Sequence, residues 1–254
     1  VISPTHREGE RIQAEIRALR KERGQLGRER TFRVLQNLNL TEAERGDAVN
    51  YLPGDVLQFH QNGKRFKRGE RVEVEGQALP LDLAGRFTAF RARTLALAEG
   101  DIVRITHNGF TMDRKHRLNN GALHRVKNFD ARGNIVLDNG WMVAKDFGHL
   151  ALGYAVTSHA AQGRNVDCVF IGQSAASLPA ASREQLYVSA SRGRQQAIIY
   201  TDDKQMLKEA VAQSDDRMSA TELVAARARE AVAVQERYRA LAREREPRER
   251  GGLE

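Results

Sequence analysis

Apolar positions at the start of the chain follow the periods of an α/β fold. Residues 1–3 read as the end of a strand, and the capping box Thr5-x-x-Glu8 follows directly. Apolar side chains at Ile12, Ile16 and Leu19 then recur at helical spacing. A strand followed by a capped helix is half of a βαβ unit, so the segment predicts the opening of such a unit.

A second strand signal lies at residues 166–172. The run VDCVFIG is apolar apart from Asp167 and ends at a glycine, which is typical of a buried strand in a parallel sheet. The next helix is predicted from Ser182-x-x-Gln185, another capping pattern, and the run QQAIIYTDD at 195–203 predicts a last buried strand. The fold class is therefore predicted to be α/β with a parallel sheet.

The pattern between these segments is strand-like. Pro53-Gly54-Asp55 is a turn signal before VLQF, and residues 100–105 (GDIVRI) echo residues 54–59 (GDVLQF) as a weak internal repeat. Asp138-Asn139-Gly140 is a hairpin signal between NIVL and WMV. We predict one or two small β-barrels, inserted into the α/β domain over residues 51–148.

The last part of the chain is predicted to be a helical tail. Ser219-x-x-Glu222 is a capping box, and apolar positions from Val224 to Ala242 follow at helical spacing before Pro247. The predicted division is thus 1–50 for the first part of the α/β domain, 51–148 for the insertion, 149–205 for the second part and 206–254 for the tail.

Composition and charge add a partner class. The 254 residues carry a net charge of +8, which favours an anionic partner. A single cysteine excludes an internal disulfide, so a reducing, cytoplasmic setting is expected. No apolar run is long enough to indicate a transmembrane helix. The chain begins with Val1 rather than methionine, and we expect it to be a fragment of a longer protein.

Candidate chemistry gathers in residues 153–194. The segment from Gly153 to Gln162 carries polar residues and precedes the strand at 166–172. Arg192 and Arg194 lie at the end of the stretch. Polar side chains at strand ends line the crevice of an α/β sheet. Arginine suits a phosphate because its planar fork donates two parallel hydrogen bonds and keeps its proton.

Two segments of this stretch, and the start of the chain, resemble motifs of superfamily 1 DNA helicases. GYAVTSHAAQGRNVDCVFIG resembles motif V of the RecD-like branch, REQLYVSASRGR resembles motif VI, and VISPTHREGERIQAEIR is similar to motif IV. The combination is most similar to the helicase part of conjugative relaxases. The resemblance implies the second RecA-like motor domain, which has the P-loop NTPase fold, with SH3-like barrels inserted.

The resemblance also implies roles for individual residues. Arg192 matches the arginine that reaches the γ-phosphate of ATP, and Gln162 and Gly163 match positions beside the nucleotide. Thr157 and His159 match positions that face the single-stranded DNA backbone. On the motif IV helix, Arg7 or Arg17 would approach the nucleotide, although a solvent-facing position is the stronger reading for Arg17.

The predicted insertion offers further DNA-contact candidates. Residues 107–121 (HNGFTMDRKHRLNNG) combine basic side chains with an aromatic residue, as single-strand binding requires. The candidates are Asn108, Arg114, Lys115 and Arg117, together with Arg104, Asn119, Asn120 and Trp141. An ordinary solvated loop is the alternative for this stretch, and a place in the core or at a barrel rim is the alternative for Trp141.

The nucleotide-holding half of a motor is missing from the sequence. No G-x-x-x-x-G-K-[ST] loop occurs, so no clustered N–H groups and lysine hold the β- and γ-phosphates. ATP and Mg²⁺ are therefore expected only in the full-length protein, and this chain alone is expected to hydrolyse no ATP. The expected partners are single-stranded DNA and the N-terminal RecA-like domain of the full-length protein.

No metal site is predicted, because Asp202 and Asp203 point to opposite faces of a strand. The alternative is a non-catalytic DNA-binding or protein-docking module.

Overall fold

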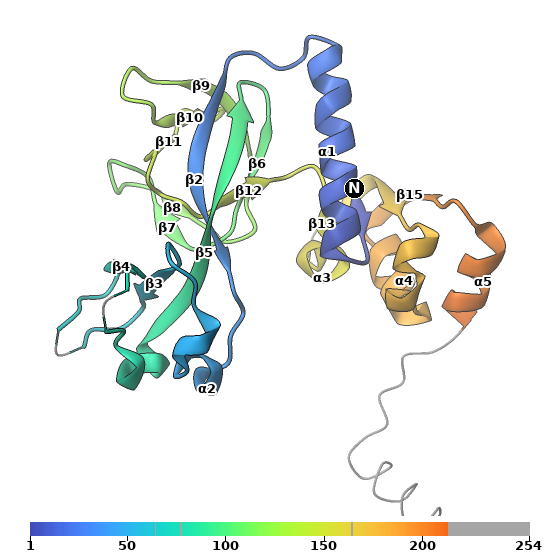
Figure 1. The fold of residues 1–254 in the computed structure, drawn as a ribbon. Coiled ribbons are helices and arrows are strands. Elements are labelled where there is room, and N and C mark those ends of the chain that lie inside the picture. The colour runs from blue at the N-terminus through green and yellow to red at the C-terminus, as the bar shows by residue number, and fades with distance from the viewer. Residues whose placement is uncertain (64, 77, 164, 213–254) are drawn as a thin grey trace, which may run out of the picture.

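The computed structural model describes residues 1–63, 65–76, 78–163 and 165–212. A parallel sheet and a larger β-rich part stand side by side, joined near the N-terminus of the chain (Figure 1). We call the first the parallel-sheet part. Its four strands are β1 (Ile2–Ser3), β13 (Val156–Thr157), β14 (Val166–Gly172) and β15 (Gly193–Tyr200), in the order β13-β1-β14-β15 with all neighbours parallel. The prediction of an α/β fold with a parallel sheet is confirmed.

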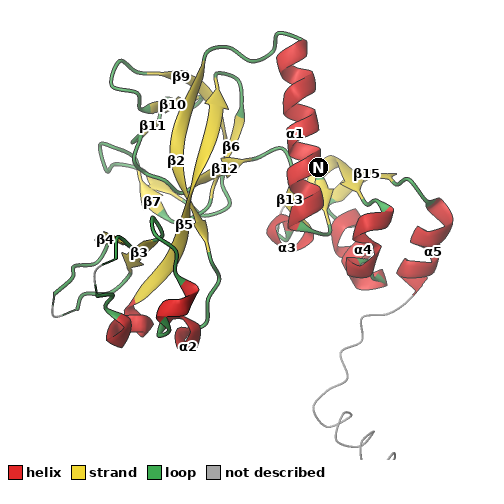
Figure 2. Cartoon of the chain, viewed as in Figure 1, coloured by secondary structure: helices red, strands yellow, loops and turns green. Residues whose placement is uncertain are grey.

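Helices border this sheet (Figure 2). They are α1 (His6–Glu22), the one-turn α3 (Ser158–Ala161), α4 (Arg183–Ala190) and α5 (Lys204–Ala212), with the 3-10 segment η3 at Ala175–Ala180. The predicted caps form, because the Thr5 hydroxyl accepts the Glu8 N–H and the Ser182 hydroxyl accepts the Gln185 N–H. Among the described residues, no helix has the length and apolar character needed to cross a membrane.

The two predicted buried strands differ from expectation. In β14, Val169 and Ile171 are buried with Ile2, but Phe170 on the opposite face is 41% exposed. Most of β15 is exposed, since it is the edge strand of the sheet. The prediction that 195–203 forms a buried strand is wrong in that respect, because β15 has a neighbouring strand on one side only among the described residues.

In the β-rich part, the described residues form three antiparallel sheets. The first has the order β2-β5-β3-β4, the second has the order β11-β10-β9-β6-β12, and the third pairs β7 with β8. Their bounds are β2 Glu29–Asn37, β3 Val56–Phe59, β4 Arg71–Glu73, β5 Phe87–Ala98, β6 Ile102–Ile105, β7 Gly109–Phe110, β8 Arg117–Leu118, β9 Leu123–Phe129, β10 Ile135–Leu137, β11 Met142–Val143 and β12 Leu150–Leu152. The short helices α2 (Glu42–Arg45), η1 (Ala48–Asn50) and η2 (Leu81–Arg86) lie between these strands in the chain.

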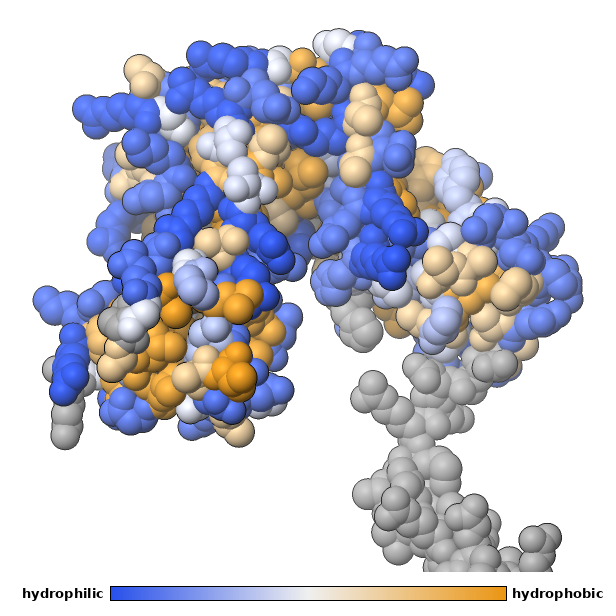
Figure 3. Space-filling view, in the orientation of Figure 1, coloured by the Kyte–Doolittle hydropathy of each residue, from blue (hydrophilic) through white to orange (hydrophobic). Residues whose placement is uncertain are grey.

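A long ribbon of β2 and β5 links two cores of the β-rich part. The strands pair over nine successive positions, from Glu29 with Ala98 to Asn37 with Phe90. One end of the ribbon contributes Phe32 and Leu97 to the core around β6, β9 and β10. The other end contributes Phe87 to a second core with Leu57 and Phe59. Hydrophobic residues are visible on the surface of the lobe that contains β3, β4 and α2 (Figure 3). The ribbon therefore belongs to both cores.

The observed strand pairing does not follow the domain boundary that the sequence predicts at residue 51. The sequence places 1–50 in the α/β domain, yet β2 lies wholly in the β-rich part, because its apolar side chains complete a core there. The SH3-like character of the insertion stays a prediction. Residues 206–212 of the predicted tail belong to α5, and its residues 213–254 lie outside the described part of the chain.

The internal repeat of the sequence is a repeat of structure. Gly54 and Gly100 both have positive φ, at 86° and 90°. Each precedes a buried aspartate, Asp55 or Asp101, whose carboxylate accepts the N–H of the residue three positions before it, at 2.9 Å and 2.7 Å. Each aspartate carbonyl also accepts a backbone N–H, from Val74 or from Val126. The hairpin predicted at residues 138–140 forms between β10 and β11.

Candidate functional site

The two motif-bearing segments meet in a buried, uncharged network of side chains. Ser158 opens α3 and is only 3% exposed, and Gln185 and Ser189 lie one turn apart on α4. The Gln185 amide donates to the Ser158 hydroxyl at 2.7 Å, and the Ser189 hydroxyl donates to the same oxygen at 2.9 Å. Because buried polar groups need partners, these bonds fix α3 against α4.

This network continues to the carboxyl end of β14. Gln173 follows the strand directly, is 1% exposed, and donates from Nε2 to the Gln185 Oε1 at 3.4 Å. Its own Oε1 is buried without a partner among the described residues. The Glu8 carboxylate accepts the Ser174 N–H at 2.6 Å and the Ser3 hydroxyl at 3.1 Å. Polar side chains thus line the carboxyl ends of β1 and β14, where α/β sheets bind ligands.

Sequence reasoning missed this network. It used Gln185 only as the last residue of a helix-capping pattern, and it assigned no role to Ser158. The available signal was the spacing of Gln185 and Ser189, which places both side chains on one face of a helix. Their partner on α3 is distant in sequence, and no local pattern identifies it.

Arg192 lies just beyond the carboxyl end of α4 and is half-buried. Its Nε donates to the carbonyl of Val188 at 3.0 Å, and its Nη2 donates to the hydroxyl of Ser191 at 2.9 Å. These bonds orient the guanidinium against the end of the helix. Of its donors, Nη1 makes no hydrogen bond within the described residues, which leaves one edge of the fork for another group.

The remaining motif residues surround α3. Thr157 ends β13, and its hydroxyl accepts the Ala160 N–H at 3.3 Å, so this side chain supports the start of α3. His159 lies within α3. Gln162 and Gly163 follow the helix and are exposed, and Gly163 has a φ of +80° that favours glycine. The structure therefore brings all the motif V candidates to one short turn beside α4.

The other set of candidates lies on the small sheet of β7 and β8. Arg114, Lys115 and Arg117 are exposed there, and Phe110 is 55% exposed. Asn108 is structural in part, because its Oδ1 accepts the Asn120 N–H at 2.9 Å. The three cations and the ring lie on the hairpin of β7 and β8.

Trp141 packs between this hairpin and the core of the β-rich part. Its ring is stacked on that of His116, with centroids 4.7 Å apart, and it packs against the core of the β-rich part. The Met112 N–H also donates to the Met142 carbonyl at 2.9 Å. The alternative of a core position for Trp141 is therefore the better description. A base would have to displace His116 to stack on that face.

Arg17 has a different position from the one expected. Its Nε donates to both carboxylate oxygens of Asp101, at 3.2 and 3.0 Å, and its Nη2 donates to Glu29 at 2.7 Å. Burial acts to lower the pKa of Arg17, but the bonds and charges of these two carboxylates outweigh it and raise the pKa. Arg17 is thus neither solvent-facing nor available to a nucleotide. It joins α1 to the β-rich part.

The adjacent carboxylates at the end of β15 have separate structural uses. Asp202 accepts the Ala175 N–H at 2.6 Å, and Asp203 accepts the Met206 N–H at 2.8 Å. Across the part of the chain that the structure describes, no cluster of histidine, cysteine and acidic side chains is arranged to hold a metal ion.

One region of the chain matches a known protein family. Residues 152–200 match the family model of the UvrD-like helicase C-terminal domain. This stretch spans the segments that resemble motif V and motif VI. A search of curated proteins finds no match.

Similar solved structures are those of Pif1 helicases. One is of two coordinating Pif1 helicases at forked double-stranded DNA, with 18% identity over 81% of this chain and 40% of that chain, at a TM-score of 0.42. A Bacteroides Pif1 with ADP-AlF3 and single-stranded DNA gives 19% identity over 81% and 41%, at 0.41. Candida albicans Pif1 gives 14% over 82% and 49%, at 0.37. The chain spans about two fifths of the length of the first two.

Proposed function

We propose that this chain is the C-terminal motor-domain fragment of an ATP-dependent superfamily 1 DNA helicase of the conjugative relaxase type. The observation that carries the proposal is the contact between the two motif segments. Ser158 of the first is bonded to Gln185 and Ser189 of the second, at 2.7 and 2.9 Å. The match of residues 152–200 to a helicase C-terminal domain covers both segments.

Arg192 acts as an arginine finger in this proposal. ATP and Mg²⁺ are held by the N-terminal RecA-like domain of the full-length protein, and the guanidinium of Arg192 stabilises charge that develops on the transferred phosphoryl group. The Nη1 edge of Arg192 has no partner among the described residues, which supports this role, since Nε and Nη2 hold the side chain at the end of α4. Gln162 and Gly163 lie beside the nucleotide, and this chain binds none of its own.

Single-stranded DNA is the second ligand of the proposed fragment. Thr157 and His159 contact its backbone from the start of α3, and the hairpin of β7 and β8 contributes Asn108, Arg114, Lys115 and Arg117. The net charge of +8 favours this polyanion, and exposed cations beside Phe110 provide the charge and aromatic surface that single strands require. The Bacteroides relative is itself described as bound to single-stranded DNA.

The DNA part is tested by removing the hairpin cations together. In the triple variant Arg114→Gln, Lys115→Gln, Arg117→Gln, we expect weaker binding of a labelled oligonucleotide. The slope of log affinity against log salt should fall by roughly 0.7 for each contact to a phosphate that the variant no longer makes. The measurement is fluorescence anisotropy across a salt series.

A matched control exists in the loop before β4. Arg65, Lys67 and Arg68 are exposed and carry the same types and number of charges. The triple variant Arg65→Gln, Lys67→Gln, Arg68→Gln should leave the slope close to that of the unmodified chain. Equal effects of the two triple variants would show that only overall charge matters and would overturn the assignment of the hairpin.

A further inference from the structure

A second basic feature lies in the β-rich part, outside the motif segments. A pocket of about 260 Å³ opens between β2 and the turn that joins β9 to β10. Its charged lining residues are Arg30, Arg33, Arg132 and Lys145, and no carboxylate belongs to its lining within the described part of the chain. Four positive side chains from three separate segments therefore converge on one small opening.

The pocket is held in shape by a buried asparagine. Asn134 is 5% exposed, and its N–H and amide both donate to the Asp130 carboxylate, at 2.7 and 2.8 Å. Its Oδ1 accepts the Lys145 N–H at 3.1 Å. Asn134 thereby fixes the turn that carries Arg132 to the segment that carries Lys145. The convergence of these cations is a consequence of ordered backbone.

Arg30 is positioned by two further features. Its guanidinium carbon lies 6.0 Å from the centre of the Phe129 ring, within range of a cation–π interaction. Its Nη1 lies only 2.8 Å from the point that a Cβ at Gly133 would occupy, and Gly133 has a φ of +88°. Any other residue at 133 would be strained and would displace the guanidinium. The glycine allows Arg30 to reach the pocket.

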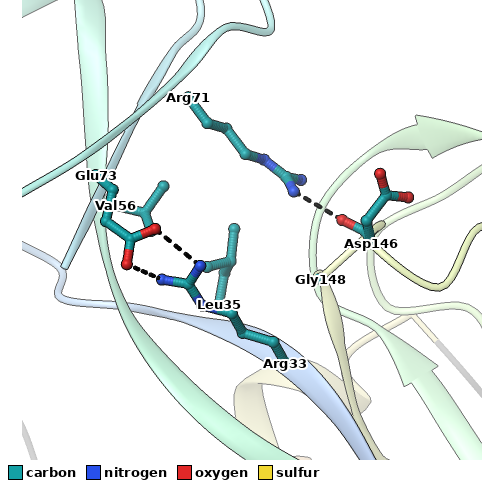
Figure 4. A pocket seen from close by; sticks show the side chains of 7 residues that line it. All are labelled: Arg33, Leu35, Val56, Arg71, Glu73, Asp146 and Gly148. Carbon is teal, nitrogen blue, oxygen red and sulfur yellow. Dashed lines mark hydrogen bonds and ion pairs between the residues drawn. The ribbon is translucent and has the colours of Figure 1, made fainter. Parts of the chain in front are cut away.

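In a neighbouring pocket, the positive side chains are bonded to acceptors of the protein itself (Figure 4). Arg33 lines both pockets, but its fork is bonded to the Glu73 carboxylate at 2.9 and 2.7 Å. Arg71 donates to the carbonyls of Asp146 and Phe147 at 2.8 and 2.6 Å. The cations of this neighbouring pocket thus have acceptors within the protein. Among the residues that the structure describes, Arg30, Arg132 and Lys145 have no such carboxylate in the lining of their pocket.

We propose that the pocket of Arg30, Arg132 and Lys145 binds a phosphate group of a nucleic acid strand. The proposal rests on the function proposed above, and it extends the DNA-binding surface onto β2 and the β9–β10 turn. Arginine forks and a lysine ammonium are the groups that bind phosphate oxygens. The volume is below that of sites that enclose a whole small ligand, so it fits one phosphate with part of its sugar.

The contact is to the backbone and carries no sequence preference. Phe32, the aromatic residue of the lining, is 5% exposed and is part of the core, so it offers no face for a base. Phosphate contacts fix the position of a strand, whereas base contacts read its sequence. Binding at this pocket should therefore be equal for oligonucleotides of different sequence and should weaken with salt.

The first arm of the test measures DNA binding by the full 254-residue chain. In the double variant Arg132→Gln, Lys145→Gln, both altered side chains are exposed, so folding is expected to be unaffected. The slope of log affinity against log salt should fall by about 0.7, the contribution of one phosphate contact on a single strand. The control is Arg93→Gln, Lys127→Gln, which removes the same charges from exposed strand positions outside the pocket.

The second arm titrates the chain with inorganic phosphate and follows the amide resonances of Gly133 and Lys145 by NMR. Saturable shifts that disappear in the double variant, together with the reduced salt slope, are the expected result. Shifts without a change of slope would make the pocket a site for free phosphate and overturn its assignment to DNA. Absence of shifts and of a slope change would overturn the site altogether.

The two arms also separate this proposal from the proposed function. If the unmodified chain binds no single-stranded DNA, the helicase reading of the chain fails, and so does the nucleic-acid assignment of the pocket. If DNA binding depends on the hairpin triple but not on Arg132 and Lys145, the proposed function stands, and the extension to this pocket is wrong.

Discussion

Two turns of the same local structure serve different purposes in this molecule. In both, a glycine with positive φ precedes a buried aspartate that accepts an N–H three residues earlier. Asp55 is bonded through both oxygens to Arg91, which lies on β5 of the same sheet. Asp101 is bonded to Arg17, which lies on α1 of the parallel-sheet part. The first turn braces one sheet, and the second joins two parts of the protein.

The difference is one of long-range partners. Asp101 is fully buried and also accepts the Tyr154 hydroxyl at 2.6 Å, so three segments of the chain meet at one carboxylate. Burial, and then the bond to Asp101, raises the pKa of Tyr154. A repeated local sequence therefore determines the turn but not what the turn connects.

The largest effect is expected from Asp101→Ala. Arg17 keeps only 17% side-chain exposure, and removal of its buried carboxylate would leave an incompletely paired charge that costs about 3 kcal/mol or more. Urea unfolding monitored by circular dichroism measures this decrease in stability. Hydrogen exchange should also speed up at the α1 amides of residues 17–22, because the joint to the β-rich part is removed.

Asp55→Ala is the matched variant. Its partner Arg91 is more accessible, with 28% side-chain exposure, so water replaces the missing carboxylate more readily. We expect a smaller decrease of unfolding free energy than for Asp101→Ala and no change of exchange in α1. Equal decreases, or faster α1 exchange in both variants, would contradict the distinction between the two turns.

The pH of the comparison matters because of His149. Burial, and then the charges of Arg71 and His107, lowers its pKa to about 3. Between pH 3 and 6.5 the unfolded chain binds a proton here that the folded protein does not, so the contribution of His149 to stability falls as pH falls below 6.5 and is constant above it. The decrease is about 1.4 kcal/mol per pH unit.

This slope is measured by urea unfolding at about pH 7, 6 and 5, which spans the titration of the unfolded histidine. His149→Gln should reduce the slope of the profile, whereas the exposed His60→Gln should not. A profile that is unchanged in His149→Gln would show that another group dominates, and the two turns would then need to be compared at each pH separately.

The smallest expected difference separates the two glycines. Alanine at Gly54 meets nothing within 4 Å, so only the positive φ of 86° is strained, at about 1 kcal/mol. Alanine at Gly100 adds a Cβ only 2.8 Å from the carbonyl oxygen of Gln25. Gly100→Ala should therefore cost more than Gly54→Ala, by thermal unfolding, and the reverse order would contradict the described approach of Gln25.

Local patterns predicted much of the fold. The caps at Thr5 and Ser182, the parallel strand at 166–172 and the hairpin at 138–140 all depend on residues close in sequence. Local patterns did not predict that β2 belongs to the β-rich part, because this depends on its pairing with β5, which lies far along the chain. The position of Arg17 was predicted wrongly for the same reason, since its partner Asp101 lies 84 residues later.

The candidate site shows the same limit. The motif segments were identified from their residue types, but the contact of Ser158 with Gln185 and Ser189 spans up to 31 positions. The basic pocket was not predicted at all, because Arg30, Arg132 and Lys145 come from three separated segments. Sequence patterns reveal which residues carry chemistry, and packing decides which of them meet.

The central claim is that this chain is half of a motor, with an arginine finger and no nucleotide site of its own. The most direct measurement is steady-state ATP turnover by the chain with saturating single-stranded DNA, beside the Arg192→Ala variant. The account predicts no turnover by either protein, with DNA still bound by both. Turnover by the unmodified chain that is abolished in Arg192→Ala would show a complete nucleotide site within these residues and contradict the account.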